Sequence, residues 1–434
     1  MSSTQKTHIH SLLWNHFHYG DGAAGYLRGR IPGLSHYLKV FFDSRSDIER
    51  LQRAEFLSER ILSLTDFADM IPLRSAVATL EVKRLIGYKK QADHTAHTVY
   101  LFLLGIWVYD HITGIREAVD RSIDSSKPLK MFVFQWTFAA LLHDLGYLYG
   151  DFEQGENSAV WVIYDEMLSF EYFSRFSGEL SKNARMELKD LWQEFSERYE
   201  LKPHREYASS QQLIEALEHI PWLAELLPSY RSGLETMNSE HSIGPGLTPF
   251  AYQMATTGYD GKPVVDHGVG GSLMLLKYTS IWYWLSEHAD QRYPVLHEEL
   301  NARFRYRMHV LEKHVVSACR AVAYHNMTEV KFRLEEEPLL YLAVLCDELQ
   351  VWDRFHSGSA FIDSWETIKH CMAEDLEAEL IVSEANEPML HLMASQLHYD
   401  KLLGSLKKRL AQWERYVQLS KVVESSFFNR RITY

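Results

Sequence analysis

Apolar residues recur at helical spacing along most of the chain. From Ser46 to Ala68 they return every three or four positions, as on one buried face of a helix, and Ser46 suits an N-cap. The same period predicts further helices over 74–88, 157–169, 183–199, 209–227 (broken by Pro221), 269–286, 310–325 and 339–349. We therefore expect a mainly α-helical fold.

Three segments depart from this pattern. Residues 1–45 show no period and are expected to be irregular with short helices, and residues 111–130 are expected to form a loop. Near the C-terminus, apolar runs on both sides of Asn386-Glu387-Pro388 predict a small β hairpin, and an amphipathic helix is predicted over 400–420.

Composition indicates a globular protein. Of its 434 residues, 46% are apolar and 24% are charged, and a chain of this length buries a sufficient core without disulfides. The three cysteines, Cys319, Cys346 and Cys371, are odd in number and form no CxxC pair. This favours a reducing compartment, and we expect a cytoplasmic location.

The chain carries no pattern typical of membranes or nucleic acids. The first residues lack a cationic stretch followed by an apolar core, and the longest apolar run, 99–109, is about half a membrane span. The net charge of −13 argues against general binding to nucleic acid or to a membrane surface.

One segment carries candidate chemistry. The helix predicted over 131–143 ends in His143-Asp144, and Gly146 is a plausible helix stop. Burial of a charged Asp beside a His is costly unless it is neutralised, and a divalent transition metal would neutralise it. Taken alone, such a dipeptide is more often an ion pair at a helix end.

Four other apolar helices each present one group of the same kind. His97 lies in the first turns of an apolar helix that continues to residue 108, and His267 begins the helix that runs to residue 286. His325 ends the helix from residue 310, and Asp347 interrupts an apolar run. Imidazoles and carboxylates together favour iron, zinc or manganese over magnesium, and a carboxylate can bridge two ions.

At these residues the chain resembles the HD-domain superfamily of metal-dependent phosphohydrolases, in its two-metal variant. The resemblance runs from about Asp93 to Arg354 and rests on the order H…HD…H…H…D, on Leu-Gly after His-Asp, and on His-Asn after an Ala-rich helix. It implies a helical metal-binding domain over 91–360 with an insertion at 150–265. An N-terminal helical or irregular segment (1–90) and a C-terminal α+β tail (361–434) would flank this domain.

The resemblance also implies roles for individual residues. It makes His97, His143, Asp144 and Asp347 ligands of one metal, makes Asp144 the bridge, and assigns His267 and His325 to the second metal. The cofactors would be two divalent transition-metal ions, such as manganese, iron or zinc. A hydroxide between them would cleave a nucleotide or related phosphoester.

Several residues have alternative interpretations. His94 competes with His97 for the first ligand position, and otherwise is a candidate general acid. Arg320, Arg354 and Lys277 are candidate substrate contacts, although each is more often an ordinary surface cation. Asp266 and Glu348 are equally suited to orienting imidazoles and to being solvated charges.

Two other functions fit the same residues. Some HD proteins use these six ligands in a di-iron oxygenase, although Tyr147 replaces the lysine that the oxygenases carry. A nucleotide-binding sensor is the second alternative, and the presence of all six ligands argues against it. We expect the insertion to shape substrate access without supplying ligands, so that His204, His219 and His241 would not bind metal. The sequence does not indicate an oligomeric state.

Overall fold

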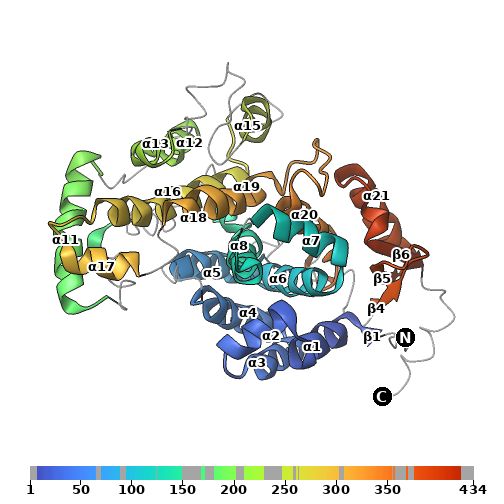
Figure 1. Cartoon of the computed structure of the whole chain (residues 1–434). Helices are drawn as coiled ribbons and strands as arrows, with labels where there is room; N and C mark the ends of the chain where they lie inside the picture. The colour runs from blue at the N-terminus through green and yellow to red at the C-terminus, as the bar shows by residue number, and fades with distance from the viewer. Residues whose placement is uncertain are drawn as a thin grey trace. The chain divides into compact units, whose positions relative to one another are not determined.

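The protein is described by a computed structural model. The structure describes residues 7–64, 70–87, 94–123, 125–148, 168–171, 180–201, 210–228, 247–257, 261, 263–302, 307–353, 355–356, 368–369 and 376–421. This part of the chain is mainly helical with a small sheet near the C-terminus, which confirms the predicted fold class (Figure 1). Most of the helix predicted over 157–169 lies outside the described residues.

The chain divides into two units. The first comprises Met1–Arg60, Glu81–Val133 and Thr328–Tyr434, and the second comprises Ile61–Leu80 and Phe134–Met327. The helices α5 (Ile71–Gly87) and α8 (Pro128–Leu141) contribute residues to both, as do the last two residues of α4 (Asp47–Leu62).

Three short helices and one longer helix begin the first unit. They are α1 (Ile9–Tyr19), α2 (Gly22–Arg30), α3 (Leu34–Phe42) and α4 (Asp47–Leu62). The carboxylate of Asp110 accepts hydrogen bonds from the backbone N–H groups of Ala23 (2.8 Å) and Ala24 (3.0 Å) and so fixes the start of α2. Gly22 precedes them with φ 66°, and a Cβ there would lie 2.3 Å from Asp110 Oδ1.

The apolar helix α6 (His94–His111) is buried from His94 to Tyr109. The loop predicted over 111–130 is wrong, because α7 (Thr113–Ile123) occupies most of this segment. Ile115, Val119 and Ile123 are four residues apart and all buried, which is a helical apolar face only three turns long. Among the described residues, no single helix has the length and apolar composition to cross a membrane, although α6 and its bent neighbour α7 meet that criterion as a pair.

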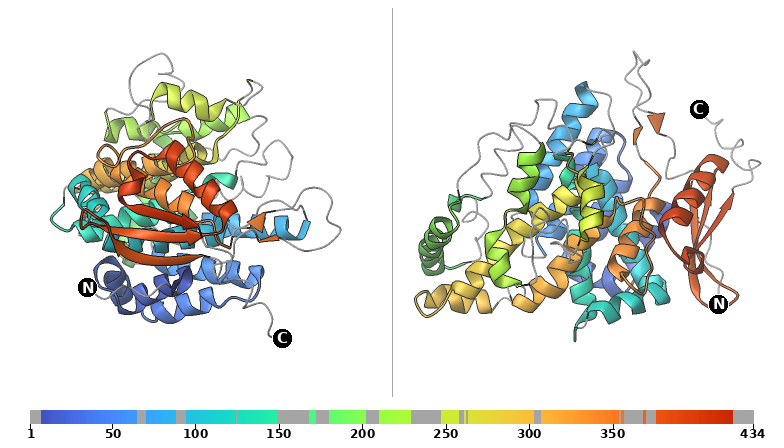
Figure 2. Two further views of the ribbon diagram at one scale, coloured as in Figure 1. Left: turned by 90° about the vertical axis from the view of Figure 1, so that its right-hand side faces the viewer. Right: turned by 90° about the horizontal axis from the view of Figure 1, so that it is seen from above.

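The sheet of the first unit has the order β1-β4-β5-β6. Its strands are β1 (Thr7–His8), β4 (Glu377–Val382), β5 (Pro388–Ala394) and β6 (Val417–Lys421). The antiparallel β4–β5 pair is the predicted hairpin, with Asn386 at φ 60° in its turn. Figure 2 shows α21 (Gln396–Arg409) along one face of this sheet. The strands β2 (Phe355–His356) and β3 (Ile368–Lys369) form a separate pair.

The helix predicted over 400–420 is wrong in its second half. The helix α21 ends at Arg409, and Gln412 then takes φ 54° before the short η7 turn (Trp413–Arg415). Residues Val417–Lys421 form β6, which pairs in parallel with β5. Pairing with a strand distant in sequence overrides the local helical pattern here.

In the second unit, α16 (His267–His288) is buried from Gly268 to Ser286. It packs against α12 (Ser210–Glu218), α13 (Pro221–Leu226), α15 (Pro249–Thr256) and α19 (Val316–Tyr324) (Figure 1). The helices α11 (Lys182–Arg198) and α17 (Pro294–Asn301) also contact it. The predicted 310–325 helix contains a π turn, Leu311–Val315, between α18 (Met308–Val310) and α19.

Candidate metal centre

The His143-Asp144 pair lies in a turn of the second unit. The helix α8 ends at Leu141, two residues earlier than predicted, and the 3-10 helix η2 covers Leu145–Leu148. The His143 ring donates its Nδ1–H to the carbonyl oxygen of Ala140 (2.8 Å). In a neutral imidazole, Nε2 is then an acceptor. This Nε2 lies 3.3 Å from Asp144 Oδ1, and both side chains are buried.

His325 is oriented in the same way. It directly follows α19 and donates its Nδ1–H to the carbonyl oxygen of Val322 (2.6 Å), so the lone pair of a neutral ring is again on Nε2. This Nε2 lies 3.8 Å from Asp144 Oδ1. His267, the first residue of α16, places its Nε2 3.0 Å from His325 Nε2 and 3.7 Å from Asp144 Oδ1.

Three imidazoles and one carboxylate therefore converge within the second unit. The ligand atoms of His143, Asp144 and His325 all lie within 4.8 Å of one another. Lone pairs and a negative charge at such distances repel unless a proton or a cation lies among them. Imidazole nitrogen with carboxylate oxygen is a ligand set for divalent transition metals, and this group could hold such an ion.

Glycines allow the backbones of this group to approach one another. A Cβ on Gly146 would lie 1.7 Å from the carbonyl oxygen of His267, a distance that no rearrangement of side chains relieves. A Cβ on Gly268 would lie 2.8 Å from the carbonyl oxygen of Val322. The Gly after His-Asp and the small first turn of α16 are thus required for η2, α16 and α19 to meet. The Tyr147 ring stacks on His267, with centroids 4.1 Å apart.

Asp266 and Asn326 link the two helix ends that carry His267 and His325. The Asp266 carboxylate caps α16 by accepting hydrogen bonds from the N–H groups of Gly268 (2.9 Å) and Val269 (3.2 Å). Its other oxygen accepts a hydrogen bond from Asn326 Nδ2 (2.7 Å). Asp266 is therefore a helix cap, and the His-Asn dipeptide was the only sequence signal for Asn326.

A second group of the same chemistry lies in the first unit. His97 Nε2, on α6, is 2.9 Å from Asp347 Oδ1, on α20 (Pro338–Leu349). The other ring nitrogen, Nδ1, lies within hydrogen-bond distance of Gln350 Oε1, and Gln350 Nε2 donates to the carbonyl oxygen of Trp352 (2.7 Å). The amide is thus fixed with its oxygen toward His97, so Nδ1 must carry a hydrogen and Nε2 faces the carboxylate. Sequence reasoning missed Gln350.

Two further predicted residues, His94 and Lys277, are buried in long apolar helices. His94 is buried at the start of α6, one turn before His97. Lys277 is also buried, and its Nζ donates to the carbonyl oxygen of Ala216 (2.6 Å), about 15 Å along α16 from His267. The structure does not bring Lys277 to the His267 end of the helix. The acid–base role of His94 stays a prediction.

The other cations and acids have partners of their own. The Arg320 guanidinium lies over the Tyr324 ring at 4.8 Å, on the helix that ends at His325. Glu348 Oε1 accepts a hydrogen bond from Arg409 (2.6 Å), so this carboxylate is held by α21. Arg354, His204 and His241 lie outside the described residues, and His219 is exposed.

Comparisons with protein-family models, with curated proteins and with solved structures found no match to this chain.

Proposed function

We propose that the chain is a metal-dependent phosphohydrolase that cleaves a nucleotide or a related phosphoester. The observation that carries the proposal is the convergence of His143 Nε2, His267 Nε2, His325 Nε2 and Asp144 Oδ1 in the second unit. The choice of phosphoester hydrolysis among the reactions of such ligands rests on the sequence resemblance.

In this proposal the protein contributes a preformed set of ligands. The backbone carbonyls of Ala140 and Val322 hold His143 and His325 with Nε2 directed toward Asp144 Oδ1, so the two rings need not reorient to bind. Asp144 offers two oxygens and is the proposed bridge. Bound divalent ions would supply an activated water and stabilise the charge that develops on the phosphoryl oxygens.

The His97–Asp347 pair is proposed to belong to the same centre. The structure describes this pair within the first unit, and its assignment to one centre with the other four side chains comes from the resemblance. Metal analysis of variants tests it. If all six residues share one centre, Asp347→Asn should release as much metal as His325→Gln. Release confined to His325→Gln would contradict the assignment.

The proposed activity is tested with protein purified without chelator. Elemental analysis should find at least one transition-metal ion per chain. Product release should then be measured from a panel of nucleoside phosphates, cyclic nucleotides and p-nitrophenyl phosphate, with manganese and with iron, in air and under nitrogen. We expect hydrolysis that does not depend on oxygen and that is lost in Asp144→Ala.

His219→Ala is the matched control, since this exposed histidine should leave both metal content and hydrolysis intact. Turnover that requires oxygen and iron, with no phosphoester cleaved, would replace the hydrolase with the oxygenase. Tight nucleotide binding without turnover in metal-loaded protein would favour the sensor instead.

A further inference from the structure

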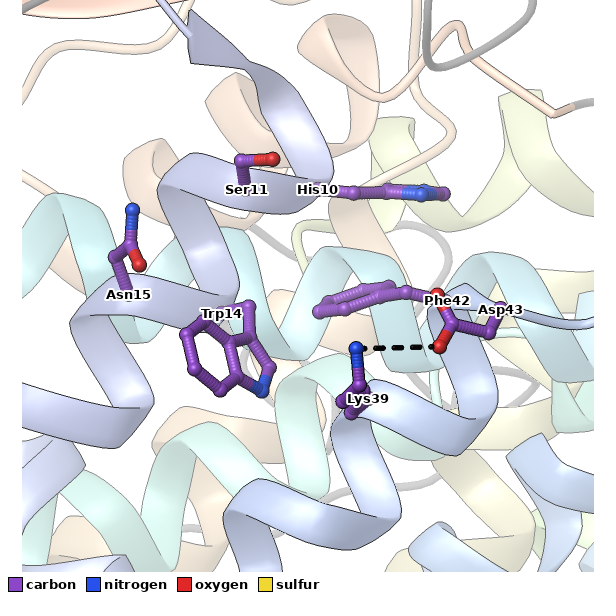
Figure 3. A pocket seen from close by; sticks show the side chains of 7 residues that line it. All are labelled: His10, Ser11, Trp14, Asn15, Lys39, Phe42 and Asp43. Carbon is purple, nitrogen blue, oxygen red and sulfur yellow. Dashed lines mark ion pairs between the residues drawn. The ribbon is translucent and has the colours of Figure 1, made fainter.

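A pocket of about 300 Å³ opens between α1 and α3 in the first unit. Figure 3 shows its lining, to which α1 contributes His10, Ser11, Trp14 and Asn15. The helix α3 contributes Lys39, Phe42 and Asp43. The volume is at the lower end of the range for small-molecule sites, so the pocket suits a ligand the size of one nucleoside.

Two aromatic rings in this pocket are already held in place. The indole Nε1–H of Trp14 donates to the carbonyl oxygen of Ser35 (3.1 Å), and its ring stacks on His18 with centroids 4.5 Å apart. Phe42 stacks on His10 with centroids 4.6 Å apart and planes 21° from parallel. Rings fixed in this way can stack on a flat ligand without losing further rotamer freedom.

Polar groups beside the rings are available to a ligand. The Asn15 amide and the Ser11 hydroxyl are exposed, and neither makes a hydrogen bond to another side chain or backbone group in the part of the chain that the structure describes. A primary amide offers a donor and an acceptor side by side, which matches the paired acceptor and donor on the edge of a purine.

The charges of the lining are balanced. Lys39 Nζ lies 3.6 Å from Asp43 Oδ2 at the exposed rim, where Figure 3 marks the ion pair. His10 Nε2 faces the buried carboxylate of Asp353 at 3.4 Å. A phosphate near Lys39 would therefore also meet the Asp43 carboxylate, so the pocket does not favour an anion.

We infer that this pocket binds the base of an uncharged purine nucleoside, stacked on Trp14 and Phe42 and read by Asn15. The inference does not depend on the proposed hydrolase activity, because no metal-binding residue lines the pocket. It assigns the α1–α3 surface as a second ligand site on the chain.

Isothermal titration of the full-length protein tests this assignment, with adenosine, guanosine and adenosine 5′-monophosphate as probes. We expect a nucleoside to bind, and its monophosphate to bind no more than threefold more tightly. Trp14→Ala should weaken nucleoside binding about tenfold or more. Asn15→Ala should weaken it about fivefold without affecting folding, because Asn15 is exposed.

Phe42→Ala should also weaken nucleoside binding. Its control is Tyr37→Ala, since both are half-buried aromatic residues on α3 and only Phe42 lines the pocket. Asp144→Ala should bind the nucleoside like the wild type, which separates this site from the proposed metal centre. The inference is overturned if no nucleoside binds at millimolar concentration, or if Asn15→Ala and Phe42→Ala both bind like the wild type. A monophosphate that binds tenfold more tightly at this site would also overturn it.

Discussion

His143 and His325 meet edge to face, with ring centroids 4.7 Å apart and planes 82° apart. Each ring donates its Nδ1–H to the carbonyl oxygen three residues earlier. A backbone contact at two separate helix ends thus selects the same tautomer and presents Nε2 of both rings toward Asp144. The orientation of these ligands follows from local structure and needs no metal to establish it.

Asp144→Asn tests whether metal binding needs the negative charge of this side chain, because asparagine has nearly the same shape and is neutral. The change should remove most of the bound metal, and hydrolysis should fall on the order of a thousandfold or more, since metal chemistry supplies several kcal/mol of barrier lowering. Metal content is measured by elemental analysis and activity by product release. Wild-type activity in this variant would exclude the proposed two-metal site.

Metal removal should lower stability in the wild type. Without a cation, the buried Asp144 carboxylate faces the lone pairs of two imidazoles, so a chelator should reduce the melting temperature. In metal-free protein, Asp144→Asn should melt above the wild type, because that repulsion is gone. If the two metal-free proteins have the same melting temperature, repulsion between the Asp144 carboxylate and the imidazoles does not destabilise the metal-free fold.

Gln350→Leu should weaken metal binding, because Gln350 holds the tautomer and orientation of His97. Loss of such a partner commonly costs 10- to 100-fold in metal affinity. Gln350→Glu keeps an acceptor beside His97 Nδ1 and should retain most of the affinity. Competition with a fluorescent chelator measures both. Gln193→Leu, on the exposed part of α11, is the control.

The residues that sequence reasoning identified are those with a local signal. The helices over 46–68, 183–199 and 339–349 were predicted because their apolar period is long, and His143-Asp144 was noticed because a charged pair ends an apolar run. Gln350 gave no such signal, since its contact with His97 joins residues 253 positions apart. The same limit applies to β6, whose pairing with β5 is not visible in the local pattern.

Gly146→Ala should disrupt the candidate centre through the backbone. A Cβ at this position would overlap the carbonyl oxygen of His267, so η2 and α16 must separate. We expect a loss of about 3 kcal/mol or more in the free energy of unfolding, together with loss of bound metal. Gly404→Ala is the control, because nothing lies within 4 Å of its Cβ position in α21. That change should be neutral or stabilise by about 0.5–1 kcal/mol.

Stability should decline below neutral pH because of His111. Burial, reinforced by the neighbouring His16, lowers the pKa of His111 from 6.5 to about 4. Between these two values the unfolded chain binds a proton that the folded chain does not, so the free energy of unfolding falls as the pH decreases through this window. Above pH 6.5 this contribution is constant. Since one pKa unit corresponds to about 1.4 kcal/mol, the loss from this residue is on the order of 3 kcal/mol.

His111→Gln isolates that contribution. Glutamine does not titrate and keeps a donor toward His16 Nδ1, which lies 3.1 Å from His111 Nε2. The curves of unfolding free energy against pH for this variant and the wild type should run parallel above pH 6.5 and converge or cross between pH 6.5 and 4. In this window unfolding exposes the half-buried imidazole of the wild type, which then takes up a proton, and the variant has no such ring. Urea denaturation at half-unit pH intervals measures both curves. Parallel curves over the whole range would show that His111 has the same pKa in the folded and unfolded chain. Burial of its ring would then not cause the fall in the free energy of unfolding at acid pH.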